Sequence, residues 1–322
     1  MIEKFLAIIE DEIRKQKYGV APSSLYEPIR YLMSIGGKRL RPMLTLLAYN
    51  LYKKNAKSVA TYAVAVEAFH NFTLMHDDIM DKAPLRRGNM TVHKKWNVNT
   101  AILSGDVMLV KVYELFSGLE AKKFREVVKQ FNICAAEVCE GQQWDMDFES
   151  TRAVSEEEYL NMIRLKTAVL LGFSLELGAI LADASAKDRK LLRDFGINIG
   201  LGFQLKDDLL DAFADPKKFG KQVGGDIMAN KKTYLLITAL ERADKSKVSE
   251  LDYWLDVSKF KRKEKVASVK KIYQDLDIPA LTEKKIDFYF DKGFRNLARL
   301  SGRDDAKELL KSFTEALIKR QS

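Results

Sequence analysis

Two acidic clusters carry the most distinctive chemistry in this 322-residue chain. They share the spacing D-D-x-x-D: Asp77, Asp78 and Asp81, and Asp207, Asp208 and Asp211. Residues four apart on an α-helix are separated by about 40° around its axis and about 6 Å along it, so the outer carboxylates of each cluster face the same way. Carboxylate oxygens suit magnesium, manganese or calcium, and magnesium commonly bridges one or two carboxylates to substrate phosphates. The clusters therefore predict a divalent-metal site for phosphorylated substrates.

The apolar surroundings of the clusters favour a site over a solvated acidic patch, which would be the commoner explanation for one cluster alone. The apolar segment Ala68–Met75 precedes the first cluster, and Ile199–Leu205 precedes the second. Like charges near the C-terminal end of a helix repel one another and oppose the helix dipole, which costs stability unless a cation offsets it. We expect both clusters to face one shared site.

Basic residues complement the clusters. Gly36–Pro42 joins a glycine turn to the cations Lys38, Arg39 and Arg41, which are suited to phosphate. Arg86 and Arg87 follow the first cluster, although each basic group alone is also compatible with an ordinary surface. The chain has neither a P-loop nor a G-x-G-x-x-G motif after a strand, and its three histidines form no convincing triad.

Composition and charge narrow the class of protein. Hydrophobic residues make up 47% and charged residues 31% of the chain, which is typical of a compact globular protein. The net charge of +9 suits anionic partners without choosing among them. The charged N-terminus lacks a secretory signal, and the apolar run 168–180 is too short and too polar to span a bilayer. We expect a cytoplasmic protein without stable membrane insertion.

The elements that position the clusters have a helical period. Apolar residues recur at spacings of three and four, and neither a hairpin signal nor a βαβ rhythm is present. The predicted helices cover residues 59–80, 101–119, 124–141, 156–181, 188–213 and 232–242. Both clusters then lie near the C-terminal ends of long apolar helices. This pattern predicts an all-α fold with a single domain over residues 1–322, in which the charged last part completes the bundle.

The motifs together resemble the trans-isoprenyl diphosphate synthases of the polyprenyl synthetase family, short-chain type. They occur in the expected order over about residues 25 to 240: GGKRLRP at 36–42, HDDIMD at 76–81 with Arg86 and Arg87, Lys166 and Thr167, and QLKDDLLD at 204–211 with Lys221 and Lys231. The resemblance implies a bundle of long helices around a deep central cavity, usually a homodimer, with no nucleic acid as partner. It also implies a prenyltransferase that joins isopentenyl diphosphate head to tail to an allylic diphosphate. The implied steps are magnesium-assisted ionisation, condensation and proton loss, with a trans double bond in the product.

The same resemblance assigns roles to residues. Metal ligands would be Asp77, Asp81 and Asp207, holding three magnesium ions per site, with manganese as an alternative. Catalytic residues would be Asp77, Asp78, Asp81, Asp207, Asp208, Asp211 and Lys166. Isopentenyl diphosphate would contact Gly37, Lys38, Arg41, His70 and Arg87. The allylic diphosphate would contact Arg86, Lys166, Thr167, Gln204, Lys221 and Lys231.

Product length depends, in this family, on the residues just before the first acidic cluster, which form the cavity floor. Phe72 lies five positions before Asp77 and Thr73 four. One aromatic residue here, and a first cluster without a two-residue insertion, favour geranylgeranyl diphosphate as product, with farnesyl diphosphate next. Phe72 could instead be ordinary core packing.

Two other functions fit a helical scaffold with acidic clusters. A terpene cyclase would have one D-D-x-x-D and an Asn/Ser/Glu metal motif, and it would not need isopentenyl diphosphate. A non-catalytic partner subunit would be expected to lack some charged ligands, whereas the set here is complete.

Overall fold

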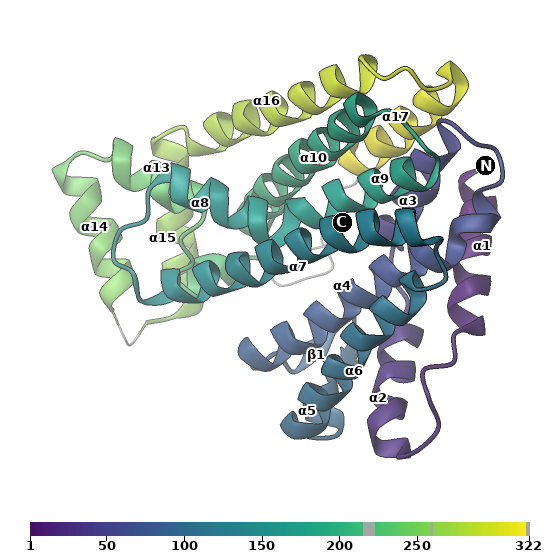
Figure 1. The fold of residues 1–322 in the computed structure, drawn as a ribbon. Coiled ribbons are helices and arrows are strands. Elements are labelled where there is room, and N and C mark those ends of the chain that lie inside the picture. Colours follow the sequence, from purple (N-terminus) through teal and green to yellow (C-terminus); the bar gives the residue numbers. More distant parts are fainter. Residues whose placement is uncertain (215–222, 258–259, 320–322) are drawn as a thin grey trace. The chain divides into compact units, whose positions relative to one another are not determined.

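The chain is mostly helical in the computed structural model, which describes residues 1–214, 223–257 and 260–319 (Figure 1). The all-α prediction is confirmed. The chain divides into two compact units. The first unit comprises Met1–Asn132, Phe173–Lys190 and Ser301–Leu310, and the second comprises Ile133–Gly172, Leu191–Leu300 and Lys311–Ser322. Each unit carries one acidic cluster.

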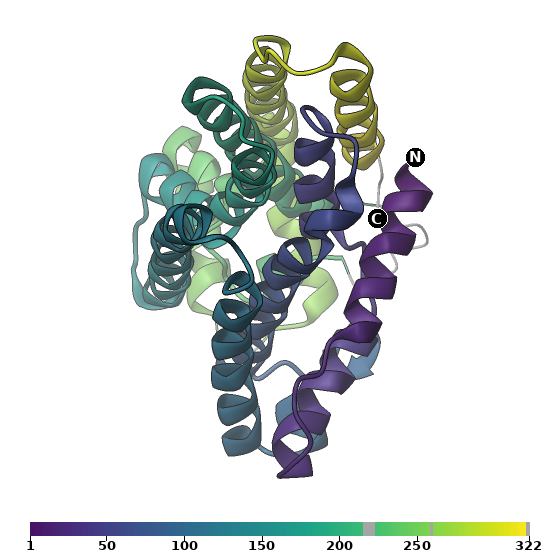
Figure 2. The same ribbon diagram turned by 45° about the vertical axis from the view of Figure 1, so that its right-hand side comes forward.

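The first unit is built mainly from the N-terminal helices. These are α1 (Ile2–Lys15), α2 (Ser23–Ser34), α3 (Leu40–Asn50), the 3-10 turn η1 (Ala56–Val59), α4 (Ala60–Met80), α5 (Val92–Lys95) and α6 (Val98–Phe116). Helix α1, dark purple in Figure 2, packs against α3 and α4. Four helices contribute residues to both units: α7 (Ala121–Ser150), α9 (Val169–Leu181), α10 (Ala186–Phe213) and α17 (Asp304–Lys319).

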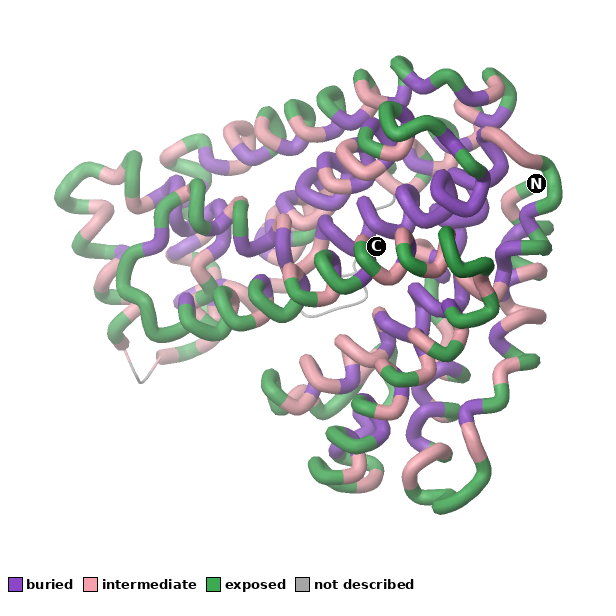
Figure 3. The backbone as a smooth tube through the Cα atoms, in the orientation of Figure 1, coloured by how far each residue is buried: buried purple, intermediate pink, exposed green. Residues whose placement is uncertain are grey.

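Helix α4 forms the core of the first unit and carries the first acidic cluster. It packs against α3 and α6, and its buried residues include Ala63, Val66, Phe69 and Met75. Figure 3 colours the chain by burial, and only the last residue of α4, Met80, is exposed. A helix that is apolar nearly all round must be covered on nearly all sides. The observed helix agrees with the one predicted over residues 59–80.

A small β-hairpin follows α4, although the sequence pattern predicted none. Strands β1 (Leu85–Arg86) and β2 (Asn89–Met90) pair antiparallel, with Leu85 opposite Met90. Arg87 and Gly88 form the turn with φ angles of 53° and 76°, the two positive values that a tight hairpin turn requires. Strands of two residues are too short to show alternation, so only the Arg-Gly pair could have signalled the hairpin.

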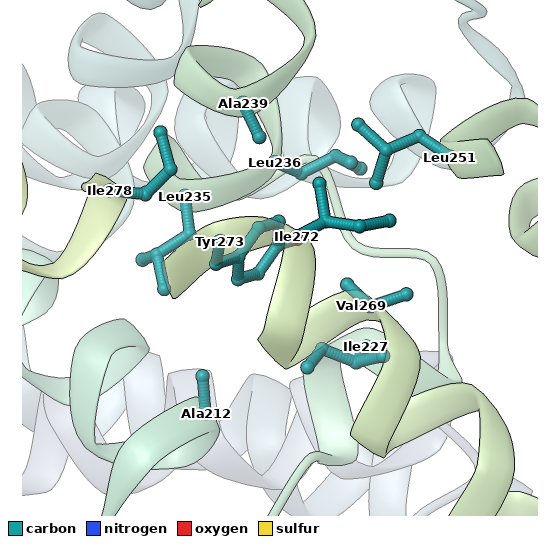
Figure 4. Packing of buried hydrophobic residues seen from close by; sticks show 10 residues of the cluster. All are labelled: Ala212, Ile227, Leu235, Leu236, Ala239, Leu251, Val269, Ile272, Tyr273 and Ile278. Atoms are coloured by element: carbon teal, nitrogen blue, oxygen red, sulfur yellow. The ribbon is translucent and has the colours of Figure 1, made fainter. Parts of the chain in front are cut away.

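The second unit contains the remaining helices of the described residues. They are α8 (Glu156–Ile163), the π-helical segment η2 (Arg164–Ala168), α12 (Gly225–Met228), α13 (Tyr234–Arg242), α14 (Lys245–Asp256), α15 (Arg262–Asp275) and α16 (Ile278–Ala298). Buried apolar side chains from these helices converge with Ala212 near the end of α10, among them Leu235, Ile272 and Tyr273 (Figure 4). This cluster supports the end of α10, where the second acidic cluster lies.

Two helices of the second unit differ from the predicted ones. Helix α7 passes Gly141, where the sequence pattern had ended it, and continues to Ser150. A Cβ atom on Gly141 would lie 2.1 Å from the backbone nitrogen of Lys166, so this glycine permits close packing and does not end the helix. The helix predicted over 156–181 is interrupted at Arg164–Ala168 by the π-helical turn that carries Lys166 and Thr167. Such turns often occur at functional sites.

Within the described ranges, no helix is both long and apolar enough to cross a membrane. The cytoplasmic location and the single-domain organisation stay predictions.

Candidate active site

The first acidic cluster lies at the C-terminal end of α4, where Asp81 is the capping residue. The middle carboxylate, Asp78, is only 2% exposed and accepts hydrogen bonds from Arg86 Nε at 3.0 Å and Nη2 at 2.5 Å. Arg86 Nη2 also lies 3.7 Å from a carboxylate oxygen of Asp77. Burial raises the pKa of Asp78, and Arg86 opposes that shift. The cluster therefore includes a cation supplied by its own chain.

The glycine turn before α3 meets the hairpin at Arg87. Gly36 and Gly37 have positive φ angles of 84° and 150°, and the Arg87 guanidinium donates a hydrogen bond to the Gly36 carbonyl. The φ of Gly37 favours glycine, and the Arg87 guanidinium lies against this residue, since a Cβ atom there would be 2.6 Å from Arg87 Nη1. The structure thus brings together the turn and Arg87, two parts of the predicted isopentenyl diphosphate site.

Other predicted ligands of the first unit lie on the same elements. Lys38 is exposed and Arg41 half-buried at the start of α3. His70 lies on α4, and burial lowers its pKa well below the usual value, with the charges of Arg41 and Arg87 acting in the same direction. A neutral imidazole can both donate and accept a hydrogen bond near a diphosphate.

The predicted floor residues lie one to two turns before the cluster on α4. The Phe72 ring packs 5.7 Å from the Phe69 ring and 4.8 Å from the His76 ring, between centroids. The Thr73 hydroxyl donates to the backbone carbonyl of His70 at 2.8 Å, so its polar atom is satisfied within its own helix. Both side chains are half-buried.

The second acidic cluster lies near the end of α10, and its middle carboxylate has different partners. Asp208 is 6% exposed, accepts from the Tyr159 hydroxyl, and accepts from Gln204 Nε2 at 3.1 Å. The Thr167 hydroxyl donates to Gln204 Oε1 at 3.4 Å, which links the π-helical turn to the cluster. Burial, followed by the charge of Asp226, raises the pKa of Asp208 to about 8.

The outer carboxylate Asp211 accepts hydrogen bonds from the backbone around the start of α12 (Gly225–Met228). Its side chain accepts from the backbone N–H of Asp226 at 3.0 Å, and its backbone carbonyl accepts from Gly224 N–H at 2.6 Å. Burial and the charge of Asp211 raise the pKa of Asp226 to about 6, against the opposing charge of Lys231. Asp207, the other outer carboxylate, is exposed.

A cavity of about 160 Å³ in the second unit is lined by Asp208, Asp226 and Lys231. Its polar lining includes Asp145, Tyr159, Lys166, Thr167, Gln204, Asp208, Asp226, Asn230 and Lys231. Lys166 Nζ lies 2.5 Å from a carboxylate oxygen of Asp145. The structure therefore brings together Lys166, Thr167, Gln204 and Lys231, as predicted for the allylic substrate, whereas Lys221 lies outside the described residues.

Several cavity residues were not predicted from the sequence. Asp145 follows Gly141 by one helical turn, and Asp226 follows the pair Gly224 and Gly225, so a glycine before an acid was an available signal in both cases. Tyr159 had no local signal, because its contact with Asp208 joins residues 49 positions apart.

The chemistry of these side chains fits a divalent cation. Burial, and after it the charge of a neighbouring carboxylate, raises the pKa of both Asp208 and Asp226, which marks negative charge in a buried setting. Among the described residues, no three Asp, Glu, His or Cys side chains are close enough to enclose a metal ion alone. Magnesium commonly takes one or two carboxylates and completes its shell with water and substrate phosphate.

Comparison with known proteins gives consistent matches. The polyprenyl synthetase family profile matches residues 22–276. The chain is 43% identical over 250 residues to a short chain isoprenyl diphosphate synthase of Methanocaldococcus jannaschii, covering 77% of this chain and 76% of the relative. It is 44% identical over 227 residues to a geranylgeranyl diphosphate synthase of Methanosarcina mazei, covering 70% of each.

Solved structures agree with the sequence matches. A crystal structure of a geranylgeranyl pyrophosphate synthase superposes with a TM-score of 0.94 at 45% identity, covering 100% of this chain and 99% of the other. A polyprenyl synthase from Caulobacter crescentus, at 26% identity and a TM-score of 0.86, was solved with calcium and isoprenyl diphosphate, covering 99% of this chain and 96% of that one.

Proposed function

This chain belongs to the polyprenyl synthetase family and is a short-chain trans-prenyltransferase, and from that premise we propose that its principal product is geranylgeranyl diphosphate. Its substrates are isoprenyl diphosphates, and its family uses divalent metal ions. The proposal covers the product, the roles of the site residues, the metal and the assembly. Farnesyl diphosphate is the second candidate product.

The network around Asp208 is the observation that carries the proposed allylic site. Thr167, Gln204 and Asp208 form one hydrogen-bonded chain beside the cavity that Lys166 and Lys231 also line. Cations and hydrogen-bond donors fixed at such a position stabilise the negative charge that develops on a departing diphosphate. We assign the allylic diphosphate to Lys166, Thr167, Gln204 and Lys231, together with Arg86 and Lys221.

Isopentenyl diphosphate is assigned to the basic residues of the first unit. Gly37 and Arg87 are in contact there, and Lys38, Arg41 and the neutral His70 lie on the adjoining elements. Arginine can bind a phosphate through two parallel hydrogen bonds, and lysine adds a compact charge. In this proposal each substrate has its own set of cations.

The metal is assigned to the outer carboxylates Asp77, Asp81 and Asp207, with Asp211 completing the second cluster. Bound magnesium ions, three per site, or manganese in their place, would offset the diphosphate charge and make it a better leaving group. The chain's own residues orient the allylic carbon toward the double bond of isopentenyl diphosphate and exclude water, which would otherwise quench the cation.

We propose one catalytic domain over residues 1–322 that contains both units and assembles as a homodimer. Coverage of the whole chain by a geranylgeranyl pyrophosphate synthase structure supports a single functional domain. Phe72 and Thr73 are proposed as the cavity floor below the first cluster. Relatives named geranylgeranyl diphosphate synthases at 39–44% identity support the twenty-carbon product.

A product assay tests the proposal. Purified protein is incubated with magnesium, isopentenyl diphosphate and each of the five-, ten- and fifteen-carbon allylic diphosphates, and the products are sized by mass spectrometry. We expect a twenty-carbon diphosphate from all three primers and no product with a chelator. A fifteen-carbon end product would overturn the product assignment, and turnover without isopentenyl diphosphate would indicate cyclase activity.

A further inference from the structure

We propose that Arg39, the middle cation of the Gly36–Pro42 segment, is a positioning residue for isopentenyl diphosphate. Its buried ion pair with Glu67 would set the geometry of Lys38, Arg41 and the turn that Arg87 contacts. This inference rests on the proposed isopentenyl diphosphate site and adds to it two residues, Arg39 and Glu67, that would never touch the substrate.

The Arg39 guanidinium is held by three separate elements of the first unit. Its Nε donates to Glu10 Oε1 on α1 at 2.8 Å, its Nη1 to Glu67 Oε1 on α4 at 3.0 Å, and its Nη2 to the Met33 carbonyl on α2 at 2.9 Å. The Arg39 and Glu67 side chains are each 2% exposed, and the Glu10 side chain is 37% exposed. Charge-assisted bonds in such a buried setting fix the guanidinium in one orientation.

These contacts separate Arg39 from the two cations beside it in the sequence. Two carboxylates already neutralise its charge, and its burial leaves no face for a diphosphate. Lys38, one residue before, is exposed, and Arg41, two residues after, is half-buried. The same segment therefore has a buried cation, Arg39, between two cations that remain at least partly exposed.

The backbone at Arg39 explains why an anchor is needed. Arg39 is the N-terminal capping residue of α3 and adopts a left-handed conformation, with φ 45° and ψ 37°. This conformation is unfavourable for a residue with a Cβ atom and persists only where surrounding contacts fix it. This left-handed residue lies between Lys38 and Arg41, so the hydrogen bonds that hold Arg39 also set the backbone from which both of these cations project.

The other end of the turn is also fixed, by Arg87. Its hydrogen bond to the Gly36 carbonyl and its contact with Gly37 join the turn to the hairpin. Glu67 lies on α4 one helical turn before His70, so the Arg39–Glu67 pair also ties the turn to the helix that carries His70. Loss of this pair should loosen the isopentenyl diphosphate site while the residues assigned to the allylic substrate keep their places.

Steady-state kinetics with the full chain tests the inference. Arg39→Lys keeps the charge but loses the three-way contact, and Glu67→Gln keeps a hydrogen-bond acceptor but loses the charge. We expect each variant to raise KM for isopentenyl diphosphate about 10-fold or more, with kcat and KM for the allylic diphosphate within about 3-fold, because a small displacement of binding groups is costly. Asp188→Asn is the matched control: Asp188 is buried in the same unit and bonded to Ser301, so this change should lower Tm without altering either KM.

Two reference variants separate failure of the inference from failure of the proposed site. Lys38→Ala and Arg41→Ala should each raise KM for isopentenyl diphosphate. If they do, and folded Arg39→Lys and Glu67→Gln leave that KM unchanged, the inference is overturned while the site stands. If Lys38→Ala and Arg41→Ala have no effect, the proposed site and the inference both fail. If Arg39→Lys and Glu67→Gln do not fold, the test uses Glu10→Gln, which changes the more exposed carboxylate partner of Arg39. This variant should raise KM for isopentenyl diphosphate about 3-fold, and an unchanged KM would overturn the inference.

Discussion

The two acidic clusters have the same spacing, yet their middle carboxylates are stabilised in different ways. Asp78 is paired with a cation, Arg86, whereas Asp208 has the neutral partners Tyr159 and Gln204 and lies near the like charge of Asp226. In both clusters the middle residue is buried and the first residue is more exposed. The shared spacing therefore reflects a shared helical geometry, while the local charge balance differs. The middle carboxylate of the first cluster is neutralised by a cation of its own chain, whereas the middle carboxylate of the second cluster accepts hydrogen bonds from uncharged groups.

The largest expected effect on activity comes from substitutions of the outer carboxylates, which should have the same role in both clusters. Asp77→Ala and Asp207→Ala should each lower kcat/KM by about 10²-fold to 10³-fold, because each removes a group that would hold a metal at the departing diphosphate. Tm should change little, since neither side chain is fully buried. Asp106→Ala, which removes an acid that is 59% exposed and outside both clusters, is the control. Near-normal turnover in either cluster variant would end the assignment of that residue to the metal.

The two middle carboxylates should contribute differently to the unfolding free energy of the metal-free protein, measured with urea at pH 7. Asp78→Asn breaks a buried ion pair and should cost about 2–3 kcal/mol of unfolding free energy. Asp208→Asn should cost under about 1 kcal/mol, because a carboxyl with a pKa of about 8 is mostly protonated at this pH and resembles an amide. Equal costs would show that the two clusters do not differ in charge balance.

Helix periodicity predicted the all-α fold and the positions of both acidic clusters along their helices, but not the hydrogen-bond partners of the middle carboxylates. The apolar stripes of α4 and α10 fix where each cluster lies, because burial of a helix face is a local property of spacing. The partner of each middle carboxylate comes from another element: Arg86 contacts Asp78 from the hairpin, and Tyr159 contacts Asp208 across 49 residues. Likewise, the sequence pattern placed a helix end at Gly141, because the close contact of this glycine with Lys166 is tertiary and leaves no trace in the local sequence.

Stability of the metal-free protein should also depend on pH through the second cluster. Folding raises the pKa of Asp208 to about 8 and that of Asp226 to about 6, above the ordinary value of 3.8. The folded state therefore binds these protons more tightly than the unfolded state. The contribution of these two groups to the unfolding free energy is greatest at low pH and falls as pH rises from about 4 to 8.

We expect thermal unfolding in chelator to show Tm falling by roughly 5 °C over this range, with a smaller fall in Asp208→Asn. Magnesium with inorganic diphosphate should reduce the slope, because a bound cation favours the ionised carboxylates. A Tm that is the same at both ends of the range in chelator, or one that rises, would contradict the raised pKa values of Asp208 and Asp226.

The smallest expected effect on rate concerns the aromatic residues that precede each cluster. Phe72 lies five positions before Asp77, and Phe203 lies four before Asp207, where its ring packs 5.8 Å from that of Phe290. If Phe72 forms the cavity floor, Phe72→Ala should lengthen the product by one or more five-carbon units while turnover stays within about 3-fold, because it removes bulk without touching a charged group. Phe203→Ala removes the same bulk beside the other cluster, so it should lower Tm and leave product length unchanged. Product sizing by mass spectrometry checks both variants.

Longer products from both variants would mean that Phe72 has no special role in setting product length. Unchanged products from Phe72→Ala would mean that Phe72 is ordinary core packing.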